Sequence, residues 1–123
     1  KEMANTFKVV NFAAEPNASG TPYVIYTAAS STTTVVLGLI LTNIHTAQVT
    51  TIVRLVSDTA NRAITNNTAN GTSLLVKDAP IPVGGSLEIL TGSKVVLETT
   101  DQLTVDCSVA DKLSGTLSIM EIT

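Results

Sequence analysis

The chain has 123 residues, enough for a domain with its own core, and we expect one domain over residues 1–123. Charged residues make up only 14% of the chain and the net charge is −3, which argues against a basic surface for nucleic acid or an anionic membrane. Aromatic residues amount to 3% and Trp is absent, so the core must be aliphatic and stacking platforms for sugars or bases are scarce.

The first two predicted strands are short. Residues 6–12, TFKVVNF, form the first strand, and the period-two alternation of a strand puts Phe7 and Val9 on the same face. A loop with two prolines and a glycine follows. Residues 23–27, YVIYT, form the second strand, and a short turn of small residues leads from it into the next.

The most apolar stretch of the chain is residues 33–42, TTVVLGLILT. Its apolar residues run without alternation from Val35 to Leu41, interrupted only by Gly38. A buried helix is one interpretation, but the β-branched residues and the glycine favour a strand. A strand that is apolar on both faces must be covered on both. One face would pack into the core, and the other would meet a second sheet or a second subunit. This pattern therefore predicts a compact β-fold that assembles with copies of itself.

The rest of the chain repeats short alternating stretches with turns about every ten residues. No segment has convincing helical periodicity, and the pattern predicts an all-β antiparallel β-sandwich, jelly-roll-like, of about nine short strands. A hairpin turn at residues 43–46 is expected to join the central strand to the next one. The remaining predicted strands are residues 48–56, 72–77, 86–90, 94–98, 103–109 and 116–122.

Three connections carry specific predictions. Residues 57–71 form the longest loop, rich in Asn and Thr, and loops of this length are usually functional or mobile. Two prolines in residues 78–82 should keep that segment out of a central ladder. Residues 91–93, Thr-Gly-Ser, are typical of a tight hairpin loop between the strands on either side.

The strand at residues 103–109 bears on whether the protein has a nucleophile. Alternation places Leu103, Val105, Cys107 and Val109 inward and Thr104, Asp106 and Ser108 outward. An enzyme hypothesis would pair Cys107 with His45, the single histidine. A buried strand thiol is normally inert, and His45 lies in a predicted turn, so we expect no catalytic residue. A single cysteine also excludes an intrachain disulfide.

The carboxylates do not form a convincing site. Asp101, Asp106 and Asp111 recur every five residues, but the first and last lie at opposite ends of one predicted strand, roughly 33 Å apart. They cannot share a calcium ion within one copy. Other carboxylates on predicted strands are Glu88, Glu98 and Glu121, which are better explained as charges that protect sheet edges than as a glycosidase pair. We therefore expect neither a metal nor another cofactor.

A mean hydropathy of +0.35 is high for a chain whose opening, KEMANTFKVV, does not read as a signal peptide. Met3 reads as the start of a protein made in the cytoplasm without an export signal. Burial between subunits would explain the apolar excess, because obligate interfaces resemble a core cut in half. Tyr23 and Tyr26, predicted on opposite faces of one strand, fit either an interface or the core and rim of a monomer. The candidate interface residues are Tyr23, Tyr26, Val36, Leu39, Ile40 and Leu41.

Several stretches together carry a family resemblance. They are PYVIYTAASSTTTVVLGLILTNIHTAQVTTIVRLV, LLVKDAPIPVGGSLEIL, KVVLETTDQLTV and LSIMEI. This sequence resembles small virion-associated structural proteins of tailed bacteriophages, especially those of cyanophage-type myoviruses. The resemblance runs from Phe7 to Ile122 and is most specific at residues 74–90. It implies a non-enzymatic component of the head, neck or tail that binds other virion proteins, commonly as a multimer, and it supplies no catalytic residues.

The sequence thus predicts a virion structural protein that forms a homo-oligomer, a trimer or dimer, and binds other virion proteins. In this interpretation the protein is made in the host cytoplasm and located in the virion. The alternative is a module that binds a host-surface glycan through the loop at residues 57–71, whose Asn and Thr groups could hydrogen-bond sugar hydroxyls.

Overall fold

The computed structural model describes residues 4–57, 71–90 and 94–123, and every regular element in these ranges is a β-strand. No helix in this described part is long and apolar enough to cross a membrane. The strands are β1 (Asn5–Glu15), β2 (Tyr23–Thr27), β3 (Thr33–Asn43), β4 (Val49–Val56), β5 (Thr72–Ile81), β6 (Ser86–Ile89), β7 (Val95–Leu97), β8 (Gln102–Cys107) and β9 (Leu113–Ile122).

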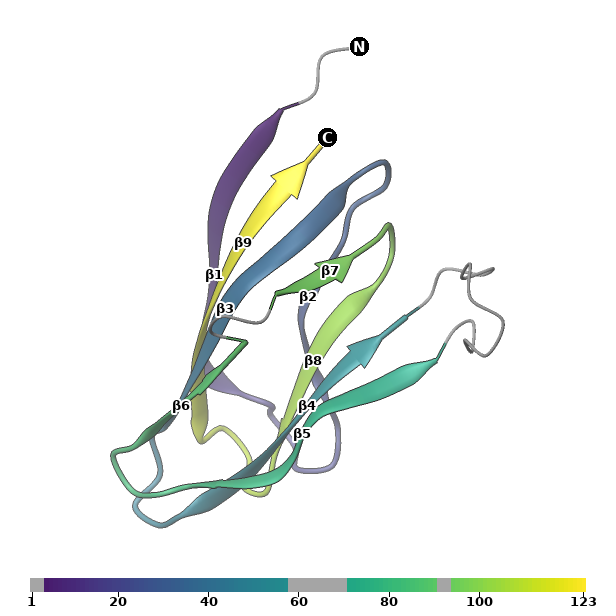
Figure 1. The fold of residues 1–123 in the computed structure, drawn as a ribbon. Helices are drawn as coiled ribbons and strands as arrows, with labels where there is room; N and C mark the ends of the chain where they lie inside the picture. Colours follow the sequence, from purple (N-terminus) through teal and green to yellow (C-terminus); the bar gives the residue numbers. More distant parts are fainter. Residues whose placement is uncertain (1–3, 58–70, 91–93) are drawn as a thin grey trace.

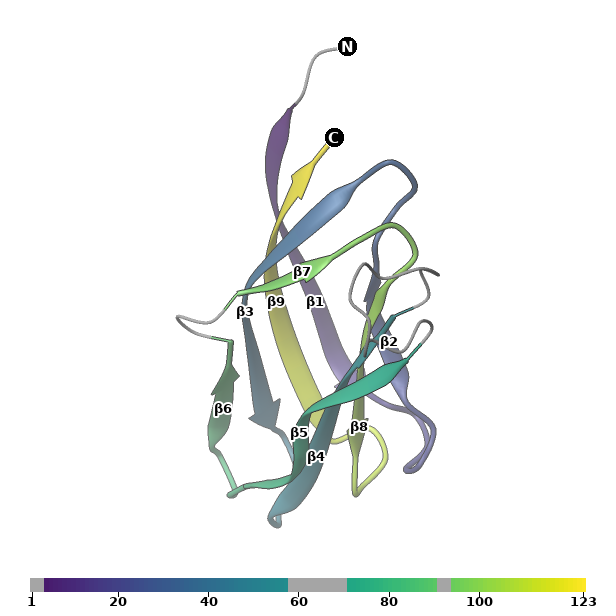
Figure 2. The ribbon, with the colours of Figure 1, turned by 45° about the vertical axis from the view of Figure 1, so that its right-hand side comes forward.

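The strands form two antiparallel sheets that pack face to face (Figure 1). The first sheet has the order β1-β9-β3-β6, with β7 also paired to β3, and the second has the order β2-β8-β4-β5. Along the chain, successive strands change sheet except at the β4–β5 and β6–β7 steps, which is the connectivity of a jelly roll. Figure 2 shows β1, β9 and β3 side by side from a second direction. The predicted fold class, an antiparallel jelly-roll-like sandwich, is confirmed.

The core lies between the two sheets and is almost entirely aliphatic. From the first sheet, Leu39 and Leu41 of β3 and Leu117 of β9 have no exposed surface, and Val53 and Val105 of the second sheet are equally buried. The one ring contact of the core joins β1 to β2. It packs Phe12 against Tyr23 with ring centroids 5.2 Å apart. A chain with so few aromatic residues can fill this space only with Val, Leu and Ile, as its composition predicted.

Alternation along β8 predicted its inward residues correctly. Val49, Thr51 and Val53 of β4 are buried on one face, as are Leu103, Val105 and Cys107 of β8. The outward residues of β8 are a partial correction. Thr104 and Asp106 are buried too, because β8 lies inside its sheet and the loop before β2 lies over Asp106, with the Gly20 N–H donating to its Oδ1 at 3.1 Å.

The predicted hairpin between residues 86–90 and 94–98 is wrong. β6 pairs with residues 39–42 of β3, and β7 pairs with residues 34–36 of the same strand. The two short strands therefore follow one another along a single edge of β3, as one interrupted strand. The proposed loop itself, residues 91–93, lies outside the described residues.

The turn after β3 is not a hairpin either, because it carries the chain from the first sheet to the second. Asn43 anchors this corner from a buried position. Its side-chain N–H groups donate to the carbonyl oxygens of Ala47, Ile81 and Pro82, at 2.9, 3.0 and 3.2 Å, and its Oδ1 accepts from the N–H of His45 at 2.7 Å. One amide thus closes the corner of the sandwich between β3, β4 and the end of β5.

The prolines of the 78–82 segment have the predicted effect, although the strand is longer than expected. β5 continues through Pro80 to Ile81, and Pro80 lies opposite Thr50 in the pairing with β4. β5 is the edge strand of its sheet, so a residue without an N–H is tolerated there. The predicted loop after β4 lies, for residues 58–70, outside the described part of the chain.

Candidate interaction surface

The outer face of the first sheet carries an apolar strip. Strand register aligns Phe7, Met120, Val35 and Val96 in one row that crosses β1, β9, β3 and β7 in turn. Phe7 is 71% exposed and Val96 is 54% exposed. Cross-strand neighbours on one face contact one another, so these four side chains form a continuous row rather than scattered surface residues.

Neighbouring rows widen this strip. On the side toward the C-terminal end of β9 lies Ile122. On the other side lie Val9 of β1, which is 61% exposed, and Leu37 of β3. Ile40 of β3 ends the strip at 43% exposure. Beyond Ile40, toward the C-terminal end of β3, the outer face of the first sheet becomes polar. The apolar strip thus consists of Phe7, Val9, Val35, Leu37, Ile40, Val96, Met120 and Ile122.

A shallow hollow interrupts the strip where β6 gives way to β7. The register of β3 shifts between Val36 and Gly38, so that Leu37 is an extra residue on the strand. A hollow of about 300 Å³ lies over this bulge, lined by Leu37, Gly38, Leu39, Ile40, Glu88, Thr116 and Ser118. A Cβ added to Gly38 would meet no atom within 4 Å, so the hollow does not depend on a tight glycine contact.

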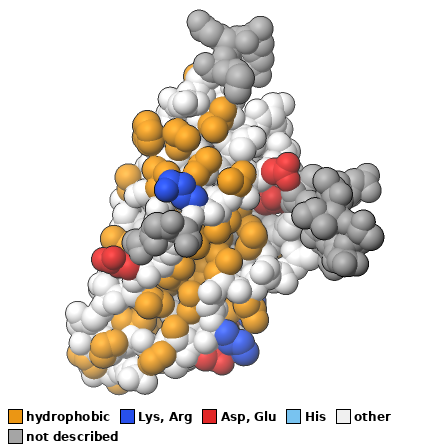
Figure 3. Space-filling view, viewed as in Figure 1, with side chains coloured by type: hydrophobic (Ala, Val, Ile, Leu, Met, Phe, Trp, Pro, Cys, Tyr) orange, Lys and Arg blue, Asp and Glu red, His pale blue; other side chains and the backbone are white. Residues whose placement is uncertain are grey.

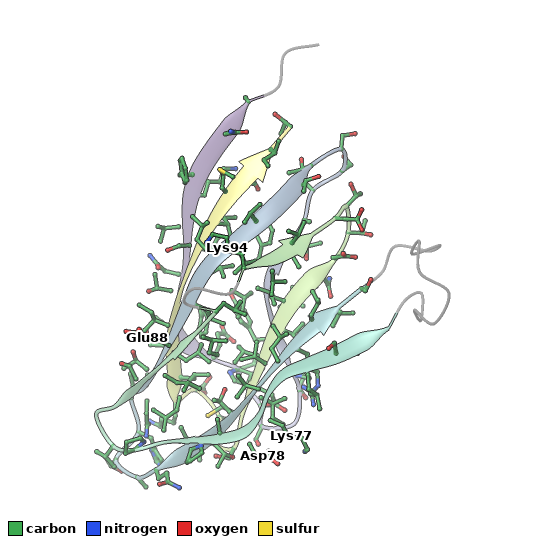
Figure 4. The ribbon with its side chains drawn as sticks, viewed as in Figure 1. Lys77, Asp78, Glu88 and Lys94 are labelled. Atoms are coloured by element: carbon green, nitrogen blue, oxygen red, sulfur yellow. The ribbon has the colours of Figure 1, made fainter. Side chains whose placement is uncertain are left out.

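Charged groups are sparse on the face that Figure 3 shows, and hydrophobic side chains extend over its upper left, where β1, β9 and β3 lie in Figure 1. Figure 4 places Glu88 and Lys94 along the edge of β3, at the break between β6 and β7. Lys77 and Asp78 lie far from them on β5, where the ammonium and carboxylate are 3.2 Å apart and both exposed. Lys94 lies among these hydrophobic side chains, Glu88 lies at their margin, and Lys77 and Asp78 lie at the other sheet (Figures 3 and 4).

Most of the predicted interface residues lie in the core instead. Val36, Leu39 and Leu41 have no exposed surface, because they form the inward face of β3. They cannot touch a partner while the chain is folded. Ile40, between Leu39 and Leu41, is the one predicted residue of β3 that points outward and is exposed.

Tyr23 and Tyr26 are not on opposite faces. The β2–β8 register shifts between Val24 and Tyr26, and both tyrosines lie opposite inward-facing residues of β8, Val105 and Leu103. The bulge adds one residue and so cancels the alternation that sequence spacing implied. Tyr23 packs on Phe12, and Tyr26 reaches across to the first sheet.

Tyr26 ends in a polar cluster at the rim of the core. Its hydroxyl donates to Glu121 Oε2 at 2.5 Å and is 2.8 Å from Thr34 Oγ1. Glu121 Oε1 also lies 2.7 Å from Lys8 Nζ. The ammonium of Lys8, and then the hydroxyl of Tyr26, hold the pKa of the Glu121 carboxyl below its usual value. Burial, and then the bond to Glu121, raise the pKa of Tyr26 to about 12. The cluster fastens β1, β2, β3 and β9 together.

The residues considered for chemistry are not brought together. Cys107 is 2% exposed and lies in the core, whereas His45 lies in the corner turn, and no hydrogen bond among the described residues joins them. Asp101 and Asp106 are buried and accept backbone N–H groups, from Glu98 and from Gly20 and Cys107 respectively. Within the described ranges no three His, Cys, Asp or Glu residues are placed to hold a metal ion.

The strip residues outside β3 were missed from the sequence, although β1 gave a signal. Phe7 and Val9 share one face of the predicted first strand while Val10 and Phe12 share the other, which is the same two-faced pattern that drew attention to β3. Met120 and Val96 had no comparable signal. Their place in the row depends on which strands pair, and local sequence does not specify that.

The fold is similar to that of chains from infectious bursal disease virus. A chain from the structure of the Gx strain matches with a TM-score of 0.55 at 12% sequence identity, over 99% of this chain and 33% of that one. A chain from the crystal structure of the T13 viral particle matches with a TM-score of 0.50 at 12% identity, over 96% of this chain and 31% of that one. At such identities the similarity shows a shared fold.

This chain therefore spans about a third of the length of those viral chains. A subunit of Bacillus endospore appendages, described as disulfide-linked pili, is a weaker match. Its TM-score is 0.46 at 15% identity, over 98% of this chain and 88% of that one. The sequence matches no protein family and no curated protein.

Proposed function

We propose that this chain is a non-enzymatic structural subunit of a virus particle, of the kind found in tailed bacteriophages. It binds copies of itself and other particle proteins. The observation that carries the proposal is the apolar strip, which runs across four strands and lies on the outside of a sandwich whose core is already complete. Soluble monomers rarely leave a contiguous apolar surface of this kind uncovered.

Two further observations support this role. The fold is shared with chains of a viral particle, and the jelly roll is a common architecture of capsid domains. The site that an enzyme would need is not assembled by His45, Cys107 or the aspartates, which the described structure holds apart or uses as backbone acceptors. The particle would be a phage particle on the strength of the sequence resemblance.

Incorporation into particles tests the proposal directly. Particles purified by density gradient from cells that make the protein would be labelled with an antibody to the chain and viewed by electron microscopy. We expect label on particles of uniform size. Ile40→Asp should be lost from the particles while remaining folded, because Ile40 is 43% exposed and the charge falls within the strip. Leu74→Asp, at 49% exposure on the second sheet, is the matched control and should be retained.

Label found only in the soluble fraction would contradict a particle role. Equal retention of both variants would show that the strip is not the surface that binds. The alternative function, glycan binding through residues 57–71, rests on a segment that is almost wholly outside the described residues, and nothing in the described structure favours it.

A further inference from the structure

The two sheets have four edges, and three of them are poor templates for another strand. β2 is five residues long and its pairing is interrupted by a bulge. β6 and β7 are four and three residues long and are separated by a break. β5 contains Pro80, the Lys77–Asp78 pair and two register shifts in its pairing with β4. Short length, bulges, charge and proline are the usual devices against edge-to-edge pairing.

The fourth edge, β1, has almost none of these devices. It is 11 residues long, and residues 5–12 pair with residues 115–122 of β9 without a register shift. No proline lies within the strand, and Lys8 is the single charge before its last residue, Glu15. Phe7 and Val9, on the outer face, are the two most exposed large hydrophobic residues of the described chain, at 71% and 61%.

The hydrogen-bond pattern identifies which backbone groups of β1 are unused. Ala4 and Thr123 exchange both of their N–H···O bonds, at 3.4 and 3.1 Å, so they are a hydrogen-bonded pair. Such pairs alternate along an antiparallel ladder, and the register continues unbroken from this pair. The even-numbered residues of β1 therefore bond to β9. The N–H and C=O groups of Asn5, Phe7, Val9 and Asn11 point to the free edge, and no hydrogen bond of the described residues occupies them.

We propose that this edge pairs with β1 of a second copy of the chain, antiparallel, about a two-fold axis at Lys8. A second copy fits this edge because the free positions are self-complementary about Lys8. Rotation about this residue places Phe7 opposite Val9 of the other copy and Asn5 opposite Asn11, so apolar meets apolar and amide meets amide. A two-fold contact requires such a self-complementary surface.

Lys8 is the charged residue of β1 that lies at the axis of this pairing. The two Lys8 side chains come together on the inner face, where like charges would repel. Each ammonium already lies 2.7 Å from Glu121 of its own chain, which offsets that repulsion. The two first sheets join into one, and the two apolar strips become a single surface with Phe7 and Val9 of both copies at its centre. This inference rests on the proposed function for its biological meaning, since it supplies the self-assembly step.

Single-cysteine cross-linking tests the register. In this pairing the two Lys8 residues form a non-hydrogen-bonded pair, whose Cα separation of about 4.5 Å suits a disulfide. Lys8→Cys should therefore form a covalent dimer under mild oxidation. Thr6→Cys is the matched control, two residues away on the same face, and its two copies would lie roughly 13 Å apart along the strands and should stay unlinked. Native Cys107 is 2% exposed and does not interfere.

Proline tests the backbone contact. Val9→Pro removes an N–H that points to the free edge and none that bonds to β9, so the fold should persist. The symmetric loss of two hydrogen bonds should raise the dimer dissociation constant by at least about 30-fold in sedimentation velocity. Val9→Thr keeps the N–H and should remain a dimer. If Val9→Pro fails to fold, cross-linking of Lys8→Cys and Thr6→Cys still tests the pairing.

A wild-type chain that is monomeric at all concentrations would overturn the edge pairing, as would a dimer in which Lys8→Cys does not cross-link or in which Val9→Pro leaves affinity unchanged. Particle labelling without edge pairing would leave the proposed function standing. Edge pairing without particle labelling would remove the particle role and keep the dimer.

Discussion

The two sheets have similar inner faces and different outer faces. Both inner faces are aliphatic and buried, but at the centre of the second sheet's outer face Arg54 lies opposite Thr104 and Ile52 lies opposite Asp106 in the β4–β8 register. The loop before β2 lies over part of that face, fixed by the Gly20–Asp106 bond. The outer face of the first sheet has the apolar strip and no such loop among the described residues.

This difference separates what stabilises the fold from what is available to a partner. On the second sheet's outer face Asp106 is bonded to the chain's own loop, whereas Arg54 Nη1 and Thr104 Oγ1 are buried and have no hydrogen-bond partner among the described residues. An apolar outer face is not needed for the core, which is complete without it, and it becomes favourable only when something covers it. Point substitutions on the two sheets test that division, in order of decreasing effect on stability.

The inner faces of the two sheets should contribute similarly to the free energy of unfolding. Leu41→Ala in β3 and Leu103→Ala in β8 each remove a side chain with no exposed surface, and each should lower the free energy of unfolding by about 2–5 kcal/mol. Ile40→Ala, next to Leu41 but on the outer face, should lower it by about 1 kcal/mol or less. Urea unfolding followed by circular dichroism measures all three. Equal losses for Ile40 and Leu41 would mean that the outer face also stabilises the isolated chain.

The polar outer face should depend on Asp106. Asp106→Ala leaves the N–H groups of Gly20 and Cys107 without their acceptor and should destabilise the fold by about 1–3 kcal/mol. Hydrogen exchange at the Gly20 amide should accelerate, because its bond to the loop's anchor is lost. Asp106→Asn, which keeps an oxygen acceptor, is the control and should lose less. A variant as stable as the wild type would show that the loop is held by other contacts.

The cluster at the rim should give stability a defined pH dependence. The pKa of Glu121 is lowered in the folded chain, so its ionised form stabilises the fold above about pH 4.5, and this contribution is lost as the pH falls through the folded-state pKa. The pKa of Tyr26 is raised to about 12, so its neutral form contributes below pH 10 and this contribution is lost as the pH rises toward 12.

Glu121→Gln should therefore lower the free energy of unfolding by about 1 kcal/mol or less at pH 7, because Lys8 is largely solvated. The difference from the wild type should shrink below about pH 4.5, where the wild-type carboxylate also becomes neutral. Urea midpoints from pH 3 to pH 8 give the comparison. A difference that stays constant over this range would assign the stabilisation to packing rather than to charge.

Sequence periodicity predicted the fold class, the β2 bounds and the inward residues of β8, since period-two alternation reports directly which side chains are buried. It failed where long-range pairing overrides local pattern. The Thr-Gly-Ser segment is typical of a hairpin, yet β6 and β7 both pair with β3, and the preference of a short turn is weak against two ladders on a buried strand.

Bulges explain part of the errors in the predicted interface. One extra residue in β2 turned Tyr26 inward, and one in β3 at Leu37 shifted the faces of that strand. One face of β3 does pack into the core as predicted, but the pattern could not tell Ile40 from the core residues Leu39 and Leu41, because an unbroken apolar run has no alternation from which to assign faces.

The smallest effect on stability is expected from substitutions at a pair of exposed edge residues. The same two substitutions should distinguish the two outer faces most clearly by their effects on association. Val96 lies at one end of the apolar strip and Leu74 lies on the outer face of β5, at 54% and 49% exposure. Replacing either by Asp should change the free energy of unfolding by no more than about 0.5 kcal/mol. Val96→Asp places a charge where a partner must exclude water, whereas Leu74→Asp adds one beside Arg54, its partner in the β4–β5 register.

Sedimentation velocity at rising concentration should then distinguish the two contacts of the first sheet. The wild type should pass from the β1-paired dimer to larger species as the strip is covered. Val96→Asp should stop at the dimer, because β7 lies at the opposite edge of the sheet from β1, and Leu74→Asp should behave as the wild type does. If the Leu74 variant lost the larger species equally, the charge alone would be responsible, and the two outer faces would not differ in the way that their side chains indicate.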